Sequence, residues 1–295
     1  MAKSTISDTL YLVNDAAHDG VEQEKGRLDF QHHVFDDMMR NELLPPHIAS
    51  EIAANPSPRI CDIAAGSAIW LKELAKTLPK TAGLFGLDFD ASRFPKPDTL
   101  PPNITLGFGN AFEPFPEELR NSFDVVNLRF FLFAVKKDQG VPLIQNLLSL
   151  VRPGGWLIWT DCTWLLSSAE PPSQALFRHQ QIQYAFGKQE NLDMDLPLAM
   201  TSYMEQAGLL ECDDRYYDSG SILFGPKASD WIPRVQRLIV TGAGQAVKGI
   251  FTKGGVDGMS TQEEYDDYIE NLRADMSGAR RPHVSVIRAW GRKPS

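Results

Sequence analysis

The alternation of short apolar runs with helix-like segments between residues 59 and 162 constrains the fold most. The apolar runs are RICDIA, AGLFGLDF, NITLGFGNA, FDVVNLRFF and GWLIWTDC. They are continuous rather than alternating, which is typical of strands in a parallel sheet that is covered on both faces. Apolar residues at helical spacing occupy 68–78 and 138–151, between these runs. This alternation predicts a doubly wound α/β fold.

The segments on either side of this core predict more helices and two further strands. Helical spacing is present at 22–44, in a short stretch after Pro45, at 171–187 and 197–208, and in an insert over 228–276. The runs LLECDDRYYD and HVSVIRAWGRK alternate more than the first five, which predicts an antiparallel final pair. We therefore expect seven strands, an N-terminal helical cap over 1–45, and a sheet domain over 46–295 with lid insertions at about 165–205 and 228–276.

Composition and charge narrow the class of partner. The net charge is −9 and the pI is near 5.2, which disfavours a nucleic-acid partner because such binding needs a basic face. We expect no signal peptide and no membrane partner, because no apolar run approaches the ~18 residues of a membrane span. The three cysteines are isolated and the six histidines are scattered. We therefore expect a reduced, cytoplasmic protein without a metal site, as a monomer or a homodimer.

Polar side chains follow several of the predicted strands. The first strand runs into DIAAGSAIW, so Asp62 precedes a short glycine turn, and the second strand ends at Asp88. Asn110 follows the third strand, and Asn127 to Arg129 end the fourth. Ligands of open α/β sheets bind at the carboxyl ends of the strands, near the point where strand order reverses. These residues are therefore the candidate ligand site.

The glycine turn discriminates among nucleotide cofactors. It lacks the G-x-G-x-x-G fingerprint that lets backbone amides approach a pyrophosphate, and the chain has no G-x-x-x-x-G-K-[ST] loop. The carboxylates of Asp62 and Asp88 suit a nucleoside with a free ribose and an amino-acid tail, because a carboxylate accepts both ribose hydroxyls. The amide of Asn110 offers a donor and an acceptor to an adenine edge.

Five motifs in order resemble the class I S-adenosylmethionine (SAM)-dependent methyltransferases, and more narrowly their fungal secondary-metabolite branch. The usual pattern of that branch is E-x-x-R-L-x-x-Q-H, D-[VI]-G-T-G-T-G-I-W, G-x-D, F-D-V-V-x-x-R and L-x-P-G-G-x-L-x-W. The matching stretches here are EKGRLDFQH, DIAAGSAIW, GLD, FDVVNLR and VRPGGWLIW. The resemblance covers most of the chain. It implies a Rossmann-like seven-stranded methyltransferase sheet, SAM as cofactor, and methyl transfer to O, N or S of a small secondary metabolite.

The resemblance also implies the cofactor contacts, position by position. It assigns Asp62, Ala64, Ala65 and Gly66 to the methionine end, Asp88 and Phe89 to the ribose, Asn110, Ala111 and Phe112 to the adenine, and Asn127 to Arg129 to the closing wall. Asn110 departs from the family, which usually has Asp there, so we expect a weakened or reoriented contact. Tyr11 and Arg27 are candidates for the methionine carboxylate. Arg27 is equally well placed to pair with Glu24 three residues earlier.

Two alanines replace family glycines in the turn. Ala68 is expected to cost little, because alanine is the better helix former at the start of the following helix. Two outcomes are open for Ala64. A positive φ would strain the alanine, whereas a negative φ would leave only a methyl group that narrows the pocket.

Candidate catalytic residues are few, because methyl transfer needs chiefly that nucleophile and methyl group be held at reacting distance. A base is needed only where the acceptor must lose a proton. His32 lies on the apolar stripe of the first helix, where a buried structural histidine is an equal alternative. His179 is a candidate for the acceptor pocket, with a structural role as the alternative, and Asp161 ends the fifth strand, where a carboxylate would face the acceptor.

Dense aromatic residues around the predicted acceptor site favour an apolar or aromatic small molecule. Two rival functions remain open from the sequence. One is a methyltransferase-like pericyclase or cyclase, which binds SAM without consuming it. The other is a regulatory methyltransferase-like protein without small-molecule turnover.

Overall fold

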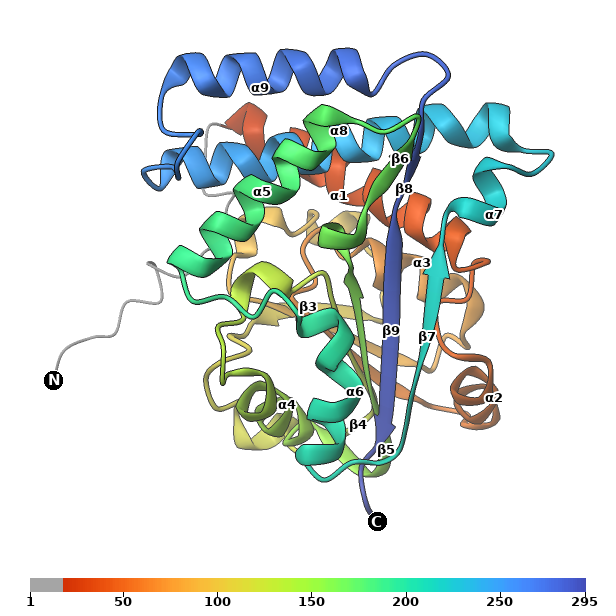
Figure 1. Ribbon diagram of the computed structural model, residues 1–295. Coiled ribbons are helices and arrows are strands. Elements are labelled where there is room, and N and C mark those ends of the chain that lie inside the picture. Colours follow the sequence, from red (N-terminus) through yellow and green to blue (C-terminus); the bar gives the residue numbers. More distant parts are fainter. Residues whose placement is uncertain (1–17) are drawn as a thin grey trace, which may run out of the picture.

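A seven-stranded sheet forms the centre of the computed structural model, which describes residues 18–295 (Figure 1). In sheet order its strands are β3 (Ile104–Phe108), β2 (Gly83–Asp88), β1 (Arg59–Ile63), β4 (Phe123–Arg129), β5 (Val151–Cys162), β9 (Ser285–Arg292) and β7 (Leu210–Asp218). The first five are parallel, and β9 is antiparallel to both of its neighbours. The predicted doubly wound, Rossmann-like seven-stranded fold is confirmed, and so is the antiparallel pairing of the last two strands.

Nine α-helices are present among the described residues. They are α1 (His18–Met38), α2 (Pro46–Ala54), α3 (Ile69–Thr77), α4 (Gly140–Leu148), α5 (Gln174–Gln189), α6 (Leu196–Gln206), α7 (Gly220–Leu223), α8 (Ala228–Thr252) and α9 (Gln262–Asp275). The prediction of one helix over 22–44 is wrong at its end, because Arg40 and Asn41 have φ of 63° and 59°, which breaks the helix after Met38. A small sheet of β6 (Ser168–Glu170) and β8 (Arg281–His283) was not predicted.

Side chains of β5 show how the two faces of the sheet are covered. Trp156 and Ile158 share a core with Ile48 of α2 and residues of α3. Leu157 and Trp159 point to the opposite face, into a core with residues of α4 and α6. Burial on both faces explains why the early strands are continuous apolar runs.

A third core lies beyond the carboxyl ends of the parallel strands, where α1, α5, α8 and α9 form a helical layer (Figure 1). Phe35 of α1, Phe186 of α5, Ile239 of α8 and Leu272 of α9 are all buried in it. The first helix therefore shares one core with the two predicted lid segments. The domain division at residue 45 stays a prediction.

Sheet order places the polar strand ends next to one another. The order reverses at β1, which has β2 on one side and β4 on the other. Asp62 is in register with Asn127 of β4, and Ile63 with Leu87, the residue before Asp88. The candidate residues therefore meet at the switch point. Within the described part of the chain, we find no helix with the length and apolar character that a membrane crossing requires.

Candidate active site

The turn between β1 and α3 has an unusual backbone. Ala64, Gly66 and Ala68 have φ of 56°, 53° and 56°, so three alternate residues are left-handed. Ala68 is the N-cap of α3 rather than its first helical residue. The reason given for a low cost of Ala68 is therefore wrong, because helix propensity does not apply to a left-handed cap. The low cost itself stays a prediction. For Ala64 the strained outcome holds.

Close packing holds this turn against the second strand. The Ala65 N–H donates to the Leu87 carbonyl at 3.2 Å. A Cβ on Gly86 of β2 would lie 3.0 Å from the Ala65 Cβ and 2.5 Å from Leu106 Cδ2, so glycine is required where the turn lies on the strand. A Cβ on Gly66 would lie 3.3 Å from Leu28 Cδ1 of α1. The first helix therefore covers the turn directly.

Asp88 ties the turn to the end of β2. Its Oδ2 accepts from the Gly66 N–H at 2.8 Å, and its Oδ1 accepts from the Asp90 N–H at 2.9 Å. The side chain is fully buried, and this burial raises its pKa despite the two backbone donors. Each oxygen keeps a second lone pair, which is what the hydroxyls of a ribose require.

A second polar chain crosses from β1 to α1. Asn127 Nδ2 donates to Asp62 Oδ1 at 2.7 Å, and Arg129 Nη1 lies 3.0 Å from His32 Nδ1. Since a guanidinium can only donate, the imidazole accepts on Nδ1 and carries its proton on Nε2. Burial, aided by the positive charge of Arg129, lowers the pKa of His32 to about 2, and burial raises that of Asp62 to about 6. His32 is therefore neutral at physiological pH, and its acceptor nitrogen is occupied by Arg129.

The predicted adenine residues lie at the end of β3 and in the turn that follows. Asn110 Oδ1 accepts from the Phe112 N–H at 3.0 Å, and the buried Ala111 carbonyl accepts from Asn146 Nδ2. Phe112 stacks on Phe131 with ring centroids 5.7 Å apart. The Asn110 carbonyl thus stabilises its own turn, and the reoriented adenine contact stays a prediction. Phe89, the predicted ribose neighbour, is 38% exposed.

Arg27 adopts the pairing with Glu24. Its Nε and Nη2 donate to the two Glu24 oxygens at 2.8 and 2.7 Å, and its Nη1 donates to Gln31 Oε1 at 2.7 Å. The three side chains line a cavity of about 150 Å³ above the strand ends. Tyr11, the other candidate for the methionine carboxylate, lies outside the described residues.

This cavity is the candidate acceptor pocket. Apolar side chains form most of its wall. They come from Leu28 of α1, from Phe130 to Ala134 after β4, from Trp164, and from the small residues Gly242, Ala243 and Ala246 of α8. Asp161 also lines it, but its oxygens accept from Phe131 N–H, Trp159 Nε1 and Cys162 N–H at 2.7–3.2 Å. Burial raises the pKa of Asp161 to about 6. Its carboxylate thus anchors the end of β4 to β5.

Two buried polar side chains of α5 enter the same cavity. His179 and Gln183 are each 1% exposed, and His179 Nε2 and Gln183 Oε1 have no hydrogen-bond partner within residues 18–295. His179 Nδ1 lies 2.7 Å from the hydroxyl of Tyr268 in α9. Burial lowers the pKa of His179 to about 3, so the ring is neutral. Sequence reasoning missed Gln183 and Tyr268, although the four-residue spacing of Gln183 from His179 was a signal.

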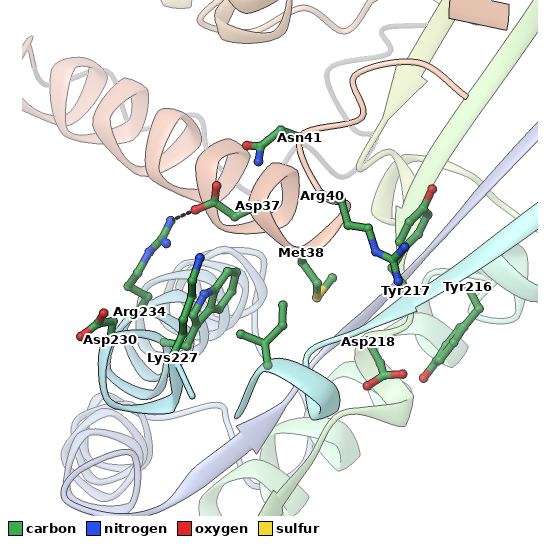
Figure 2. A pocket seen from close by; sticks show the side chains of 12 residues that line it. Asp37, Met38, Arg40, Asn41, Tyr216, Tyr217, Asp218, Lys227, Asp230 and Arg234 are labelled. Carbon is green, nitrogen blue, oxygen red and sulfur yellow. Dashed lines mark ion pairs between the residues drawn. The ribbon is translucent and has the colours of Figure 1, made fainter. Parts of the chain in front are cut away.

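A second cavity, of about 600 Å³, lies at the other end of α1 and beside the carboxyl end of β7 (Figure 2). Its charged groups are of both signs, and Arg234 Nη2 pairs with Asp37 Oδ2 at 2.6 Å. None of the predicted site residues lines it. No three metal-binding side chains cluster anywhere in the described chain.

Comparison with known proteins gives the following similarities. No protein-family model matches the chain. The N-methyltransferase tcpN of Claviceps purpurea is 31% identical over 210 residues, which are 71% of this chain and 74% of that protein. The methyltransferase grgD of a Penicillium species is 28% identical over 265 residues, 86% of this chain and 88% of that protein. Phosphoethanolamine N-methyltransferase 2 of Haemonchus contortus, solved with S-adenosyl-L-methionine, aligns at 14% identity with a TM-score of 0.47, covering 84% of this chain and 52% of that one.

Proposed function

The chain belongs to the class I SAM-dependent methyltransferases, in the branch of the fungal N-methyltransferase tcpN, and from this premise we propose that it methylates a nitrogen atom of a small, largely apolar metabolite. The proposed acceptor site is the cavity between α1, α5 and α8. Nitrogen is chosen among O, N and S because tcpN is named for that chemistry.

The polar groups at the switch point fit SAM as cofactor. Asp62 uses Oδ1 for Asn127 and has no described donor at Oδ2, so this oxygen is available to an ammonium group. Arg129 Nε is a buried donor without a partner among residues 18–295. It can therefore donate to the carboxylate of the methionine end. We propose that these two residues hold the methionine end and that Asp88 holds the ribose through its remaining lone pairs.

The observation that carries the proposal is the position and lining of the cavity. Residues at or just beyond the ends of β4 and β5, including Phe130 and Asp161, form one wall, and the cap helices form the other. An acceptor there would lie beside the proposed methionine end. Apart from the Glu24–Arg27 pair, Arg93 and Asp161, no charged side chain of the described chain lines it, which favours a neutral, apolar acceptor.

Positioning rather than acid–base chemistry carries the proposed reaction. Bound SAM supplies an electrophilic methyl group on a sulfonium. The cavity wall would orient the acceptor so that its nitrogen lone pair faces the proposed methionine end, where the methyl group would be supplied. The lowered pKa values of His32 and His179 leave neither able to hold a proton near neutral pH, so the methylated nitrogen releases its proton to water. Catalytic roles predicted for His32 and His179 as bases are not part of this mechanism, and Asp161 has an anchoring role in it.

Purified protein, SAM and a panel of small aromatic amines and phenols test the proposal by mass spectrometry of products and S-adenosylhomocysteine. We expect methylated amine and S-adenosylhomocysteine in equal amounts. Ala246→Phe, which fills the cavity, should abolish turnover and leave SAM affinity unchanged. Ala274→Phe, on the exposed face of α9, is the matched control. Methylation of phenols alone would contradict the choice of nitrogen. Conversion of an acceptor without S-adenosylhomocysteine would support the cyclase alternative.

The absence of a nucleic-acid partner stays a prediction, supported by the net charge of −9. A cytoplasmic location and a monomeric or homodimeric state stay predictions.

A further inference from the structure

We propose that His179 and Gln183 bind the acceptor as a pair, and that they select molecules whose edge carries one hydrogen-bond donor beside one acceptor. Tyr268 is the positioning residue that fixes the imidazole. This inference rests on the proposed function, which identifies the cavity as the acceptor pocket. It adds the hydrogen-bonding groups that the acceptor must have.

The two side chains have the placement that such a pair requires. They are four residues apart on α5, so they lie on one helix face about 5–6 Å apart at Cβ. Both line the cavity and both are 1% exposed, and His179 Nε2 and Gln183 Oε1 are buried atoms without a described partner. Buried polar atoms are rarely left unpaired, and a ligand in the cavity is the group that can satisfy both.

Tyr268 determines which hydrogen-bonding role His179 offers. Its hydroxyl lies 2.7 Å from Nδ1, and the two rings stack with centroids 6.1 Å apart. Burial raises the pKa of the Tyr268 phenol, so it keeps its proton, and Nδ1 is its only described acceptor. The phenol therefore donates to Nδ1, and the neutral ring carries its own proton on Nε2. His179 then presents a donor to the cavity, beside the Gln183 carbonyl as an acceptor.

This pattern predicts discrimination against molecules that lack either group. Such a molecule would leave a buried donor or acceptor unpaired, and we expect it to bind about tenfold more weakly or worse. The rest of the wall is apolar and contributes to affinity without this discrimination.

Calorimetry with two flat probe molecules tests the pair on the S-adenosylhomocysteine-saturated protein. Indazole carries an N–H donor beside a ring-nitrogen acceptor, and 1-methylindazole lacks the donor. We expect wild-type protein to bind indazole at least about tenfold more tightly than 1-methylindazole. Gln183→Leu should remove this preference, whereas Gln189→Leu, on the exposed side of α5, should keep it. Gln183→Met serves the same purpose if the leucine variant does not fold.

Tyr268→Phe has a separate readout. ¹⁵N NMR of the His179 ring should show the Nε2–H tautomer in wild-type protein and a mixture of tautomers in the variant, with the indazole preference reduced. Equal affinity for both probes, no indazole binding by folded wild-type protein, or a preference that survives Gln183→Leu would each overturn the pair. Absence of SAM binding, with the probe preference intact in protein without S-adenosylhomocysteine, would instead refute the proposed function and leave the pair standing.

Discussion

Replacing Ala64 by glycine should stabilise the protein, although glycine substitutions usually destabilise. Ala64 has φ of 56° and is only half-buried, whereas Ala65 next to it is buried and has no positive φ. An L-residue in the left-handed region costs about 1–2 kcal/mol relative to glycine. The greater freedom of glycine in the unfolded chain lowers the gain in unfolding free energy by about 0.4–1 kcal/mol. Ala64→Gly should therefore raise the free energy of unfolding by about 0.5–1 kcal/mol.

Two neighbouring alanines provide matched controls, for which we expect different changes in the free energy of unfolding. Ala68 has the same φ but is fully buried, so its glycine variant also loses a packed methyl group, worth about 0.8 kcal/mol. Ala68→Gly should be close to neutral. Ala65→Gly relieves no strain and loses both the methyl contact and chain restriction, so it should destabilise by about 1–2 kcal/mol.

Urea unfolding followed by circular dichroism measures all three variants on one scale. For a domain of this size, about 1 kcal/mol corresponds to about 2–4 °C in Tm. A rise for Ala64→Gly with a fall for Ala65→Gly supports the strained turn. Equal destabilisation by both variants would refute the reasoning, because it would show that the backbone at 64 costs nothing.

Two more predictions concern the buried carboxyl groups. Asp88→Asn should weaken SAM binding at least about tenfold in calorimetry, because the single amide oxygen cannot accept from the Gly66 N–H, the Asp90 N–H and both ribose hydroxyls. The exposed Asp98→Asn is the control, and equal affinity in both variants would contradict the ribose role. Asp62 and Asp161 have pKa values raised from 3.8 to about 6, so the folded state binds their protons more tightly than the unfolded state. Their contribution to stability should therefore fall as pH rises from about 4 through 6. Asp161→Asn should flatten that fall in urea unfolding at a series of pH values, and an unchanged slope would show that the Asp161 carboxyl does not titrate there.

The fold was predictable because its information is local and repeated. Five continuous apolar runs gave the parallel strands, and the more alternating runs gave β7 and β9. The meeting of Asp62 with Asn127 followed from strand order alone, since both end neighbouring strands. From the sequence, both residues were expected in one candidate ligand site at the strand ends, whereas the strand order comes from the structure.

The parts that escaped prediction depend on backbone geometry or on distant partners. The left-handed cap at Ala68 is invisible to a propensity argument, because alanine favours a helix that this residue only precedes. Tyr268 meets His179 across 89 positions of sequence, and α9 has no motif that indicates the contact. The spacing of Gln183 from His179 places both on one helix face, but only the structure shows that burial leaves the Gln183 carbonyl unpaired.

Simultaneous measurement of methylated product and S-adenosylhomocysteine over one time course, with a small aromatic amine as acceptor, tests the central claim most directly. We expect the two to accumulate in a one-to-one ratio in wild-type protein and neither to form in Ala246→Phe. Conversion of the acceptor without S-adenosylhomocysteine, or turnover undiminished in Ala246→Phe, would contradict methyl transfer in this cavity.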